Sequence, residues 1–424
     1  MTKLEQLIKT FCPNGVPFVK LGEVCELQNG FAFKSSLFKG KGLPILRISN
    51  IQKAGIDVDS LVFFEEQDYH TNLNQFKVFP DDIVIALSGA TTGKLGRNKT
   101  DKIFYLNQRV AKFIPQVGKL LNGYLYHFLQ TQSQKFLYMA GGGAQPNLST
   151  ETLKRITIPV PPIAVQNEIM RILDAFTELT AELTAELTAR KQQYNYYLNE
   201  LLNFGNSSLP LIKNLCPNGV EYRTLGELGE FYSGLTGKTK NDFKDGNADF
   251  VTYKNIYSNP ALSIDVEDKV KINANEKQNT VQDGDVLFTG SSETPEECGM
   301  SSVLTVKTDK KLYLNSFCFG FRFKQLNLFN PDFCKHLFRS YSLRQQLQKT
   351  ADGVTRFNVS KKKMAKVNIP VPSLVIQNEI VRILDRFETL CRDVSVGLPA
   401  EIKARQQQYE YYRNKLLTFA KVRF

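Results

Sequence analysis

Polar residues suited to base recognition recur at matching places in the two halves of the sequence. Arg47 and Asn50 follow a β-like run in the first half, and Lys254 and Asn255 occupy the matching position in the second. Arginine can form two hydrogen bonds with guanine, and asparagine can do the same with adenine. Each of these residues is equally compatible with an ordinary polar loop. They are therefore candidates for contact with DNA bases, with a purely structural alternative.

A Gly/Thr-rich loop in the first half suits phosphate contact. Residues 89–94 follow a β-like run and include Thr91 and Lys94, and Arg97 comes just after them. The loop resembles a nucleotide-binding P-loop, but it is one residue short. Leu95 also stands where that motif needs Ser or Thr to hold magnesium. We therefore interpret the loop as a phosphate-contacting segment rather than a nucleotide site.

A short basic segment in the second half offers another candidate edge. Arg356 and Asn358 precede Lys361 and Lys362. Such a run is either a solvated face or an edge that grips the sugar–phosphate backbone. The chain has 54 Lys and Arg against 42 Asp and Glu, a formal net charge of +12. This excess favours a polyanionic partner, because each phosphate that a cation neutralises releases counterions.

Catalytic and metal-binding residues form no set that can be placed. The three histidines and seven cysteines show no Cys-x-x-Cys pair and no zinc-type or Ser/His/Asp arrangement. Residues 330–333, Asn-Pro-Asp-Phe, differ from the Asn-Pro-Pro-Phe motif of adenine methyltransferases, and they predict a helix N-cap at Asn330 instead. We expect no catalytic residue, no bound cofactor, no metal site, and reduced, mostly buried cysteines.

These candidates belong to a chain that repeats itself with a period of about half its length. Residues 158–174 and 369–385 share Ile-Pro-Val-Pro, Gln-Asn-Glu-Ile and Arg-Ile-Leu-Asp. Residues 189–197 and 404–412 share Ala-Arg, Gln-Gln-Tyr and Tyr-Tyr, and Cys-Pro-Asn-Gly-Val occurs twice. The period is far longer than that of a solenoid. The chain is therefore predicted to contain two copies of one globular-plus-helix unit.

The repeat divides the chain into four regions. Residues 1–157 and 205–368 mix β-like runs with helical stretches, whereas residues 158–204 and 369–424 have the apolar spacing of long helices. The predicted fold class is α+β. Two mixed α/β domains are separated by two long antiparallel helices that form a coiled coil, with a pseudo-twofold internal repeat.

Specific elements are expected inside the mixed regions. The predicted strands are 83–87, 110–114 and 317–323, and the predicted helices are 120–139 and 332–349. The short segment 4–11 resembles 211–215, which follows the first long helix. The N-terminus is therefore predicted to continue the C-terminal helix.

The long helices are expected to pair because neither can bury its apolar stripe within its own region. Residues 163–204 alone would form a helix about 60 Å long. The predicted pairing residues follow the repeated Gln-Asn-Glu motif in each copy: Ile169, Ile172, Phe176, Ile380, Ile383 and Phe387. Gly397 and Pro399 predict a break or kink in the second helix.

The sequence Glu-Leu-Thr-Ala occurs three times in succession at 178–189 and places Leu179, Leu183 and Leu187 at four-residue spacing. Each repeat adds about 6 Å of rise and about 40° of rotation to a helix. The segment is either a good helix-forming filler or a ruler that sets the distance between the two mixed regions.

The repeated helical motifs, the Tyr-Tyr endings and the four-residue repeat resemble, over the whole chain, the DNA-specificity (S) subunit of type I restriction–modification enzymes. The resemblance implies that each mixed region is a target recognition domain that reads one half of a split DNA sequence. It implies that the helical regions set the spacing and dock two methyltransferase (M) subunits. S-adenosylmethionine, ATP and Mg would belong to the M and restriction (R) subunits. In this family the number of four-residue repeats changes the gap between half-sites.

The expected function is therefore a non-catalytic DNA-binding specificity subunit of a type I restriction–modification complex. Its partners would be double-stranded DNA, two M subunits and R subunits, and its two diverged domains would read different half-sites. No apolar run is long enough to span a membrane and no signal peptide is recognisable, so a cytoplasmic protein without membrane contact is expected. The alternatives are an orphan DNA-binding or coiled-coil scaffold protein, and a self-contained methyltransferase or nuclease.

Overall fold

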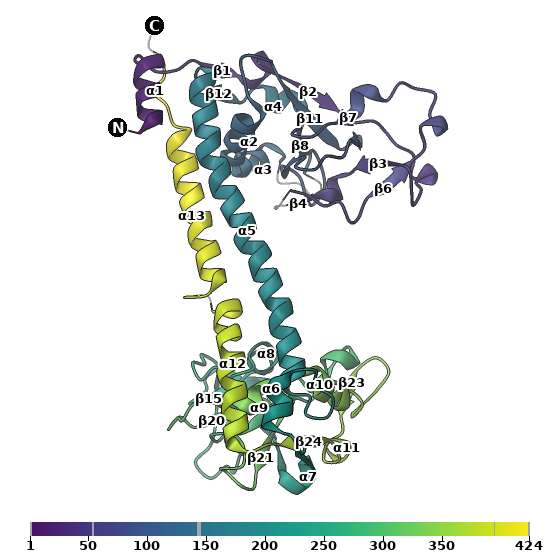
Figure 1. Cartoon of the computed structure of the whole chain (residues 1–424), viewed down its shortest axis with the longest axis vertical. Helices are drawn as coiled ribbons and strands as arrows, with labels where there is room; N and C mark the ends of the chain where they lie inside the picture. The colour runs from purple at the N-terminus through teal and green to yellow at the C-terminus, as the bar shows by residue number, and fades with distance from the viewer. Residues whose placement is uncertain (1, 53–54, 142–145, 394, 423–424) are drawn as a thin grey trace. The chain divides into compact units, whose positions relative to one another are not determined.

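The computed structural model describes residues 2–52, 55–141, 146–393 and 395–422 of the chain (Figure 1). Contacts divide the chain into two compact units. Unit 1 comprises Met1–Thr184 and Glu401–Phe424, and unit 2 comprises Ala185–Ala400. Unit 1 therefore combines both ends of the sequence, in agreement with the predicted relation between the N-terminus and the last helix.

Unit 1 contains sheets and short helices around two hydrophobic core clusters. In its described part, one four-stranded sheet has the order β2 (Cys25–Asn29), β11 (Val110–Pro115), β8 (Ile83–Ala86) and β9 (Leu95–Arg97). A second has the order β6 (Val62–Phe64), β3 (Leu43–Leu46), β10 (Phe104–Leu106) and β7 (Lys77–Val78). The strand pairs are β1 (Phe18–Lys20) with β12 (Thr157–Pro159) and β4 (Ile51–Gln52) with β5 (Gly55–Ile56). The helices before the long one are α1 (Lys3–Phe11), α2 (Asn122–Thr131), α3 (Ser133–Met139) and α4 (Thr150–Lys154).

Unit 2 repeats this construction with different peripheral elements. In the part that the structure describes, its four-stranded sheet has the order β14 (Gly229–Ser233), β21 (Cys318–Phe323), β17 (Val286–Thr289) and β19 (Ser301–Val303). The smaller sheets are β16 (Lys269–Val270), β15 (Ala248–Val251) and β20 (Leu312–Leu314), then β18 (Ser291–Ser292), β23 (Phe357–Val359) and β22 (Ala351–Asp352), and the pair β13 (Glu221–Thr224) with β24 (Asn368–Val371). The shorter helices are α6 (Pro210–Leu215), α7 (Leu225–Leu228), α8 (Tyr253–Ser258), α9 (Pro331–Leu337), α10 (Tyr341–Gln348) and α11 (Lys361–Met364).

The two main sheets are equivalent in strand order and register. β11 lies between β2 and β8, and β21 lies between β14 and β17. Ile83 faces Phe113 in unit 1, and Val286 faces Phe321 in unit 2, with all four side chains fully buried. The internal repeat therefore extends into the mixed regions, where the two sequences have diverged.

The long helices differ in continuity. α5 (Ile163–Leu201) runs for 39 residues without interruption. The second helical region is broken into α12 (Leu374–Arg392) and α13 (Leu398–Leu416), as Gly397 and Pro399 predicted. A side chain at Gly397 would clash with the carbonyl oxygen of Thr389, so glycine permits the close approach of the two helix ends. Among the described residues, no helix is both long and apolar enough to cross a membrane.

The element predictions were accurate for strands and less so for the short helices. The predicted strands correspond to β8, β11 and β21, and Asn330 caps α9 by accepting a hydrogen bond from the Asp332 amide. The predicted helices 120–139 and 332–349 were wrong as single helices, since each is a pair. α2 ends at Thr131 with Gln132 as its C-cap, and Ser340 has the extended backbone of an N-cap. Apolar spacing continues across both joints because both helices of each pair face the same core.

Candidate functional site

Two equivalent turns lie at the start of β11 and β21, and we call them the Asn turns: residues 107–110 and 315–318. In each, the amide of the fourth residue donates to the asparagine carbonyl oxygen, at 2.8 Å for Val110 and 3.0 Å for Cys318. The asparagine side chain accepts from the amide of the third residue, Arg109 at 3.5 Å or Phe317 at 2.8 Å. The Asn turns therefore hold Arg109 and Phe317 in the same framework position.

Backbone contacts around the Asn turns are duplicated as well. The carbonyl of Arg109 accepts from Leu87 at 2.9 Å, and that of Phe317 accepts from Gly290 at 2.8 Å. A side chain at Gly30 or Gly234 would clash with the carbonyl oxygen of the turn asparagine. Only glycine allows the first strand of each main sheet to end so close to the turn.

Unit 2 gathers basic and aromatic side chains around its Asn turn. Phe317 is 59% exposed, and the Arg356 guanidinium lies 5.6 Å from the centre of its ring. Arg356 also donates to Ser291 Oγ at 3.2 Å. Lys361 donates to Ser233 Oγ at 3.2 Å and lies 5.3 Å from the ring of Phe319. Burial lowers the pKa of Lys361.

Asn358 and Lys362 complete this basic edge. Asn358 is exposed on β23, opposite Ser291, and Lys362 is exposed on α11. Among the described residues, neither side chain has a hydrogen-bond or ion-pair partner. The structure thus brings together the candidates of the short basic segment: Arg356, Asn358, Lys361 and Lys362.

Unit 1 has the same framework with other side chains. Ser88 pairs with Asn147 as Ser291 pairs with Asn358. Arg109 is exposed, and no side-chain partner is found for it within the described residues. Sequence reasoning missed Arg109 and Phe317. The available signal was their place two residues after the repeated Tyr-Leu-Asn, in a segment where the copies differ.

The matched asparagines Asn50 and Asn255 fold back on their own loops. Asn50 is fully buried and donates to both Ser60 oxygens at 3.2 Å. Asn255 donates to the Ser263 carbonyl at 2.8 Å. Of their basic neighbours, Arg47 is half-buried with its guanidinium 6.0 Å from the Phe38 ring centre, and Lys254 is exposed. The two positions are equivalent, but the asparagine amides are occupied within the protein.

The Gly/Thr-rich loop is only partly available. The Thr91 hydroxyl donates to the Ile48 carbonyl at 3.1 Å. Lys94 is half-buried, without a side-chain partner in the described part of the chain. Arg97 is 14% exposed and forms ion pairs with Asp81 at 2.5 Å and Asp174 at 3.4 Å. Arg97 therefore joins β9 to α5.

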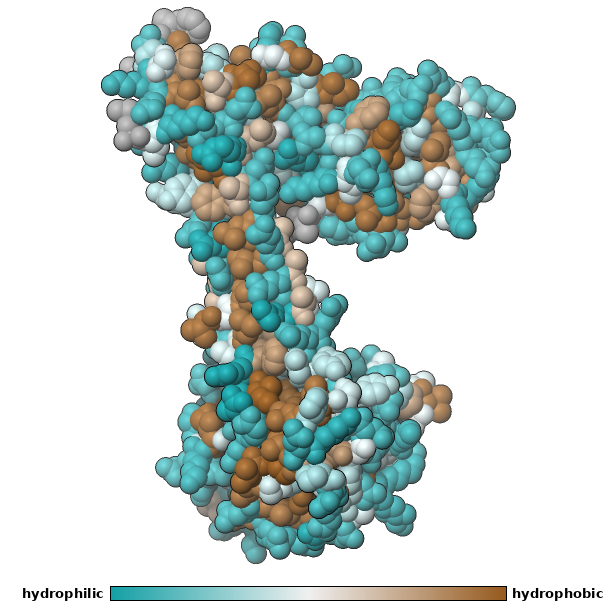
Figure 2. Space-filling model, in the orientation of Figure 1, coloured by the Kyte–Doolittle hydropathy of each residue, from teal (hydrophilic) through white to brown (hydrophobic). Residues whose placement is uncertain are grey.

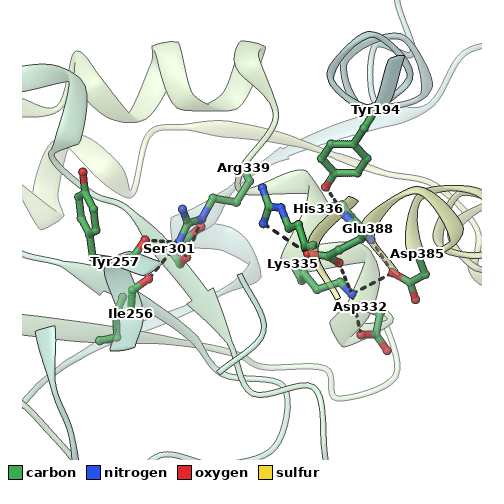
Figure 3. Close-up of polar contacts among 11 residues, drawn as sticks. Tyr194, Ile256, Tyr257, Ser301, Asp332, Lys335, His336, Arg339, Asp385 and Glu388 are labelled. Atoms are coloured by element: carbon green, nitrogen blue, oxygen red, sulfur yellow. Dashed lines mark hydrogen bonds and ion pairs between the residues drawn. The ribbon is translucent and has the colours of Figure 1, made fainter. Parts of the chain in front are cut away.

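Each unit contains a hydrogen-bonded set around a buried histidine, which we call a Tyr–His–Asp relay. In unit 1, His127 Nε2 lies 2.9 Å from Asp174 Oδ1, and Nδ1 lies 2.9 Å from the Tyr409 hydroxyl. In unit 2, His336 makes the corresponding contacts with Asp385 at 2.7 Å and with Tyr194 at 3.3 Å (Figure 3). Each relay joins a helix of the mixed domain, the long helix that follows it, and the helix of the other copy.

Charges around the relays differ. Burial lowers the pKa of His127 despite its hydrogen bond to Asp174. In unit 2 the ammonium of Lys335 lies 2.9 Å from Asp385 and 3.0 Å from Glu388 (Figure 3). Burial opposes the charged form of Lys335, but these carboxylates raise its pKa. His336, Asp385 and Glu388 have the spacing of a metal-ligand set, yet Lys335 already supplies the cation.

Two further contacts fix the mixed domains to their helices. Gln166 is buried, donates to the Lys119 carbonyl at 2.7 Å and accepts from the Leu121 amide at 3.0 Å. Gln377 is also buried and makes the equivalent bonds to the Leu328 carbonyl, at 3.0 Å, and from the Asn330 amide, at 2.7 Å. In unit 2, Arg339 adds hydrogen bonds to the backbone carbonyls of Ser301, Ile256 and Tyr257 (Figure 3).

The predicted pairing residues contribute in two ways. Phe176 stacks on Tyr412, with ring centres 5.4 Å apart, and Phe387 stacks on Tyr197 at 5.3 Å. The four isoleucines, Ile169, Ile172, Ile380 and Ile383, pack against the core of their own unit. On the face seen in Figure 2, apolar side chains follow the helices, whereas hydrophilic side chains cover most of the mixed domains.

Contacts within unit 2 show the direction of its helix pair. Phe387 of α12 stacks on Tyr197 of α5, and Arg392, five residues further along α12, lies over the ring of Tyr194. The contact partner on α5 therefore moves towards the start of α5 as α12 proceeds. This part of the pair is antiparallel. In the four-residue repeat, Leu183 is buried and Leu179 and Leu187 are half-buried.

Comparison with known proteins places both copies in one family. Residues 13–190 and 217–404 match the type I restriction modification DNA specificity domain. The chain is 32% identical over 320 residues to the EcoR124I/EcoR124II type I restriction enzyme specificity subunit of Escherichia coli, covering 72% of each chain. It is 31% identical over 438 residues to a putative type I restriction enzyme specificity subunit of Haemophilus influenzae, covering 99% of each.

Solved structures share the fold. The type I restriction–modification S subunit from M. genitalium has a TM-score of 0.53 at 14% identity, covering 95% of this chain and 96% of that one. A chain from a structural study of type I R-M complex assembly and conformational transition has a TM-score of 0.60 at 15% identity, covering 96% and 98%. The predicted α+β fold, with two specificity domains and a long helix between them, is confirmed. The chain therefore belongs to the type I restriction–modification DNA specificity family, as a non-catalytic specificity subunit.

Proposed function

We propose that this specificity subunit reads a bipartite DNA sequence, with one half-site recognised by each mixed domain. The observation that carries the proposal is the pair of Asn turns. Their backbone framework is duplicated, whereas the side chains that they present differ. One framework with two sets of presented residues suits two different DNA words of similar geometry.

Basic side chains without a carboxylate partner support contact with the DNA backbone. The candidates that remain available are Lys94, Arg109, Lys254, Arg356, Lys361 and Lys362. None of them has a carboxylate partner among the described residues, as the excess of basic residues in the chain allows. We do not retain Arg97, Asn50 or Asn255 as DNA contacts, because their polar groups are occupied within the protein.

Exposed residues shared by both helical regions support docking of the same partner twice. Tyr196 and Tyr411 occupy equivalent positions and are 51% and 61% exposed. Arg171 and Arg382 are also equivalent, and each forms an ion pair one turn back on its own helix. Tyrosine and arginine are favoured anchors of protein interfaces. We propose that two M subunits dock here, and that R subunits join them. S-adenosylmethionine, ATP and Mg would belong to these partners.

We propose that α5 acts as the spacer between half-sites. It is uninterrupted through all three Glu-Leu-Thr-Ala repeats. Removing one repeat shortens a helix by about 6 Å, which corresponds to at most about two base-pair steps. Deletion of residues 182–185 should therefore shorten the preferred gap by one or two base pairs and leave both half-site words unchanged.

The test is selection from duplex DNA with two randomised half-sites and a variable gap. The full chain would be used with the M subunits of its own system. We expect two different short words at a fixed gap, and binding that weakens steeply with salt. Absence of any two-word preference would overturn the proposal. Binding to partners that hardly responds to salt, without DNA selection, would favour the coiled-coil scaffold instead.

A further inference from the structure

We infer that the third residue of each Asn turn determines specificity. In this proposal Arg109 recognises a guanine in the half-site of unit 1, and Phe317 packs against a thymine methyl group in the half-site of unit 2. The inference rests on the proposed function, and it assigns a base type to one position of each domain.

Arg109 and Phe317 occupy equivalent positions in the two units but differ in side-chain chemistry. The carbonyls of Arg109 and Phe317 bond to the chain that leaves β8 or β17, and their amides face the turn asparagine. Because both backbone groups are held in the same way, the side chains leave the sheet from equivalent points. A difference between half-sites can therefore arise by substitution at this one position.

The chemistry of Arg109 points to guanine. Its guanidinium is exposed and, within the described residues, has neither a carboxylate nor a carbonyl partner. A free guanidinium can donate two parallel hydrogen bonds to the O6 and N7 atoms of guanine in the major groove. Lysine could not reproduce this planar pair of donors.

The chemistry of Phe317 points to thymine. Phe317 is 59% exposed, so more than half of its surface, which is largely apolar, is left in water. In the major groove the apolar group that distinguishes one base is the thymine methyl. The Arg356 guanidinium lies over the ring and donates to Ser291, so it restrains the ring while keeping its positive charge near the DNA backbone.

The surrounding charges fit this placement. Lys361 and Lys362 follow on α11, and Lys361 lies close to Phe319, two residues along the strand from Phe317. Phosphate contacts of this kind set the position of a reading residue, and the residue itself supplies the sequence preference. Phe317 therefore lies near lysines, Lys361 and Lys362, that can bind the phosphates of the DNA backbone.

The experiment uses altered bases in the words selected by the full chain with its M subunits. Each thymine of the second half-site is replaced in turn by deoxyuridine, which lacks only the methyl group. Each guanine of the first half-site is replaced by 7-deazaguanine, which lacks the N7 acceptor. Binding is measured for the wild type, Phe317→Ala and Arg109→Ala. The matched controls are Leu326→Ala in unit 2 and Val117→Ala in unit 1, exposed apolar residues outside the Asn turns.

One deoxyuridine should weaken wild-type binding by about fourfold, the value of one buried methyl group, and should have no further effect on Phe317→Ala. One 7-deazaguanine should weaken wild-type binding by about fivefold or more and leave Arg109→Ala unaffected. Phe317→Arg should change the preferred base at that same position and leave the first word intact. The controls should respond to altered bases as the wild type does.

Two outcomes separate this inference from the proposed function. If the wild type selects two words but the Phe317 and Arg109 variants retain full sensitivity to every altered base, the inference is wrong and bipartite recognition stands. If the wild type selects no words, the proposed function fails, and the inference fails with it.

Discussion

The two Tyr–His–Asp relays make the same hydrogen bonds in different electrostatic surroundings. In unit 1 the relay carboxylate of Asp174 is shared with Arg97, which comes from the edge strand β9. In unit 2 the relay carboxylate of Asp385 is shared with Lys335, which is the neighbour of His336 on α9. The two units therefore keep the same hydrogen bonds between domain and helix, but the cation that neutralises the relay aspartate comes from a different element in each.

The largest effect is expected from Lys335→Met. This change leaves Asp385 and Glu388 without the ammonium that now lies 2.9 and 3.0 Å from them. Because Asp385 remains 40% exposed, we expect a loss of about 2–3 kcal/mol, below the full cost of breaking a buried pair. Chemical denaturation would measure it. Arg97→Met should cost less, because Arg97 lies 3.4 Å from Asp174 and its other partner, Asp81, is 51% exposed. An equal or larger loss for Arg97→Met would contradict the comparison.

The Asn turns should respond equally in the two units. Gly30→Ala and Gly234→Ala each place a methyl group against the carbonyl of the turn asparagine, and we expect each to cost about 2 kcal/mol through overpacking. Gly40→Ala is the control, because nothing lies within 4 Å of the added atom. Thermal unfolding would compare the three. A large effect at only one of the two turns would show that the frameworks are not equivalent.

Removing the tyrosine hydroxyl of each relay should reduce the free energy of unfolding by a smaller amount, which differs between the two units. Tyr409→Phe loses a 2.9 Å hydrogen bond and Tyr194→Phe loses one of 3.3 Å. We expect about 1 kcal/mol for the first and about half of that for the second. A double-mutant cycle with His127→Gln and His336→Gln would isolate each pair. Coupling that is stronger in unit 2 would contradict the distances.

The smallest effect is a pH dependence carried by unit 1. Burial lowers the pKa of His127 below its ordinary value of 6.5, so the unfolded chain binds the proton more readily than the folded one. The stability that this histidine contributes is therefore present above about pH 6.5 and is lost as the pH falls below it. Unfolding curves at pH 7.5 and pH 5.5 should show this loss, and His127→Gln should reduce it. An undiminished slope in His127→Gln would assign the effect to other groups.

Sequence reasoning was most successful where it followed the repeat. The helical motifs predicted the long helices and the break before Pro399, because apolar spacing along one helix is a local property. It also matched Asn50 with Asn255 correctly as positions. The sequence pattern could not show that the side-chain amides of both asparagines bond within the protein. Their partners, Ser60 and Ser263, lie in loops whose conformation cannot be predicted from the local sequence.

The relays were missed for a different reason. His127 and His336 occur in similar short segments, Tyr-His-Phe-Leu and Lys-His-Leu-Phe, within regions that have diverged. Each histidine meets a tyrosine from the helix of the other copy, so the three members come from three separate segments. Arg109 and Phe317 were missed because they differ between the copies, and matched residues alone cannot reveal a divergent position. The assignment of bases to them stays a prediction.

The composition of unit 1 has a consequence for biosynthesis. Unit 2 is continuous in sequence, from Ala185 to Ala400, whereas unit 1 needs Glu401–Phe424 to be complete. A ribosome therefore synthesises every residue of unit 2 before it makes Tyr409, the last member of the unit 1 relay. Domains usually fold in the order of their synthesis. Here the part of unit 1 that is translated first must wait for residues 401–424, which are made only after all of unit 2.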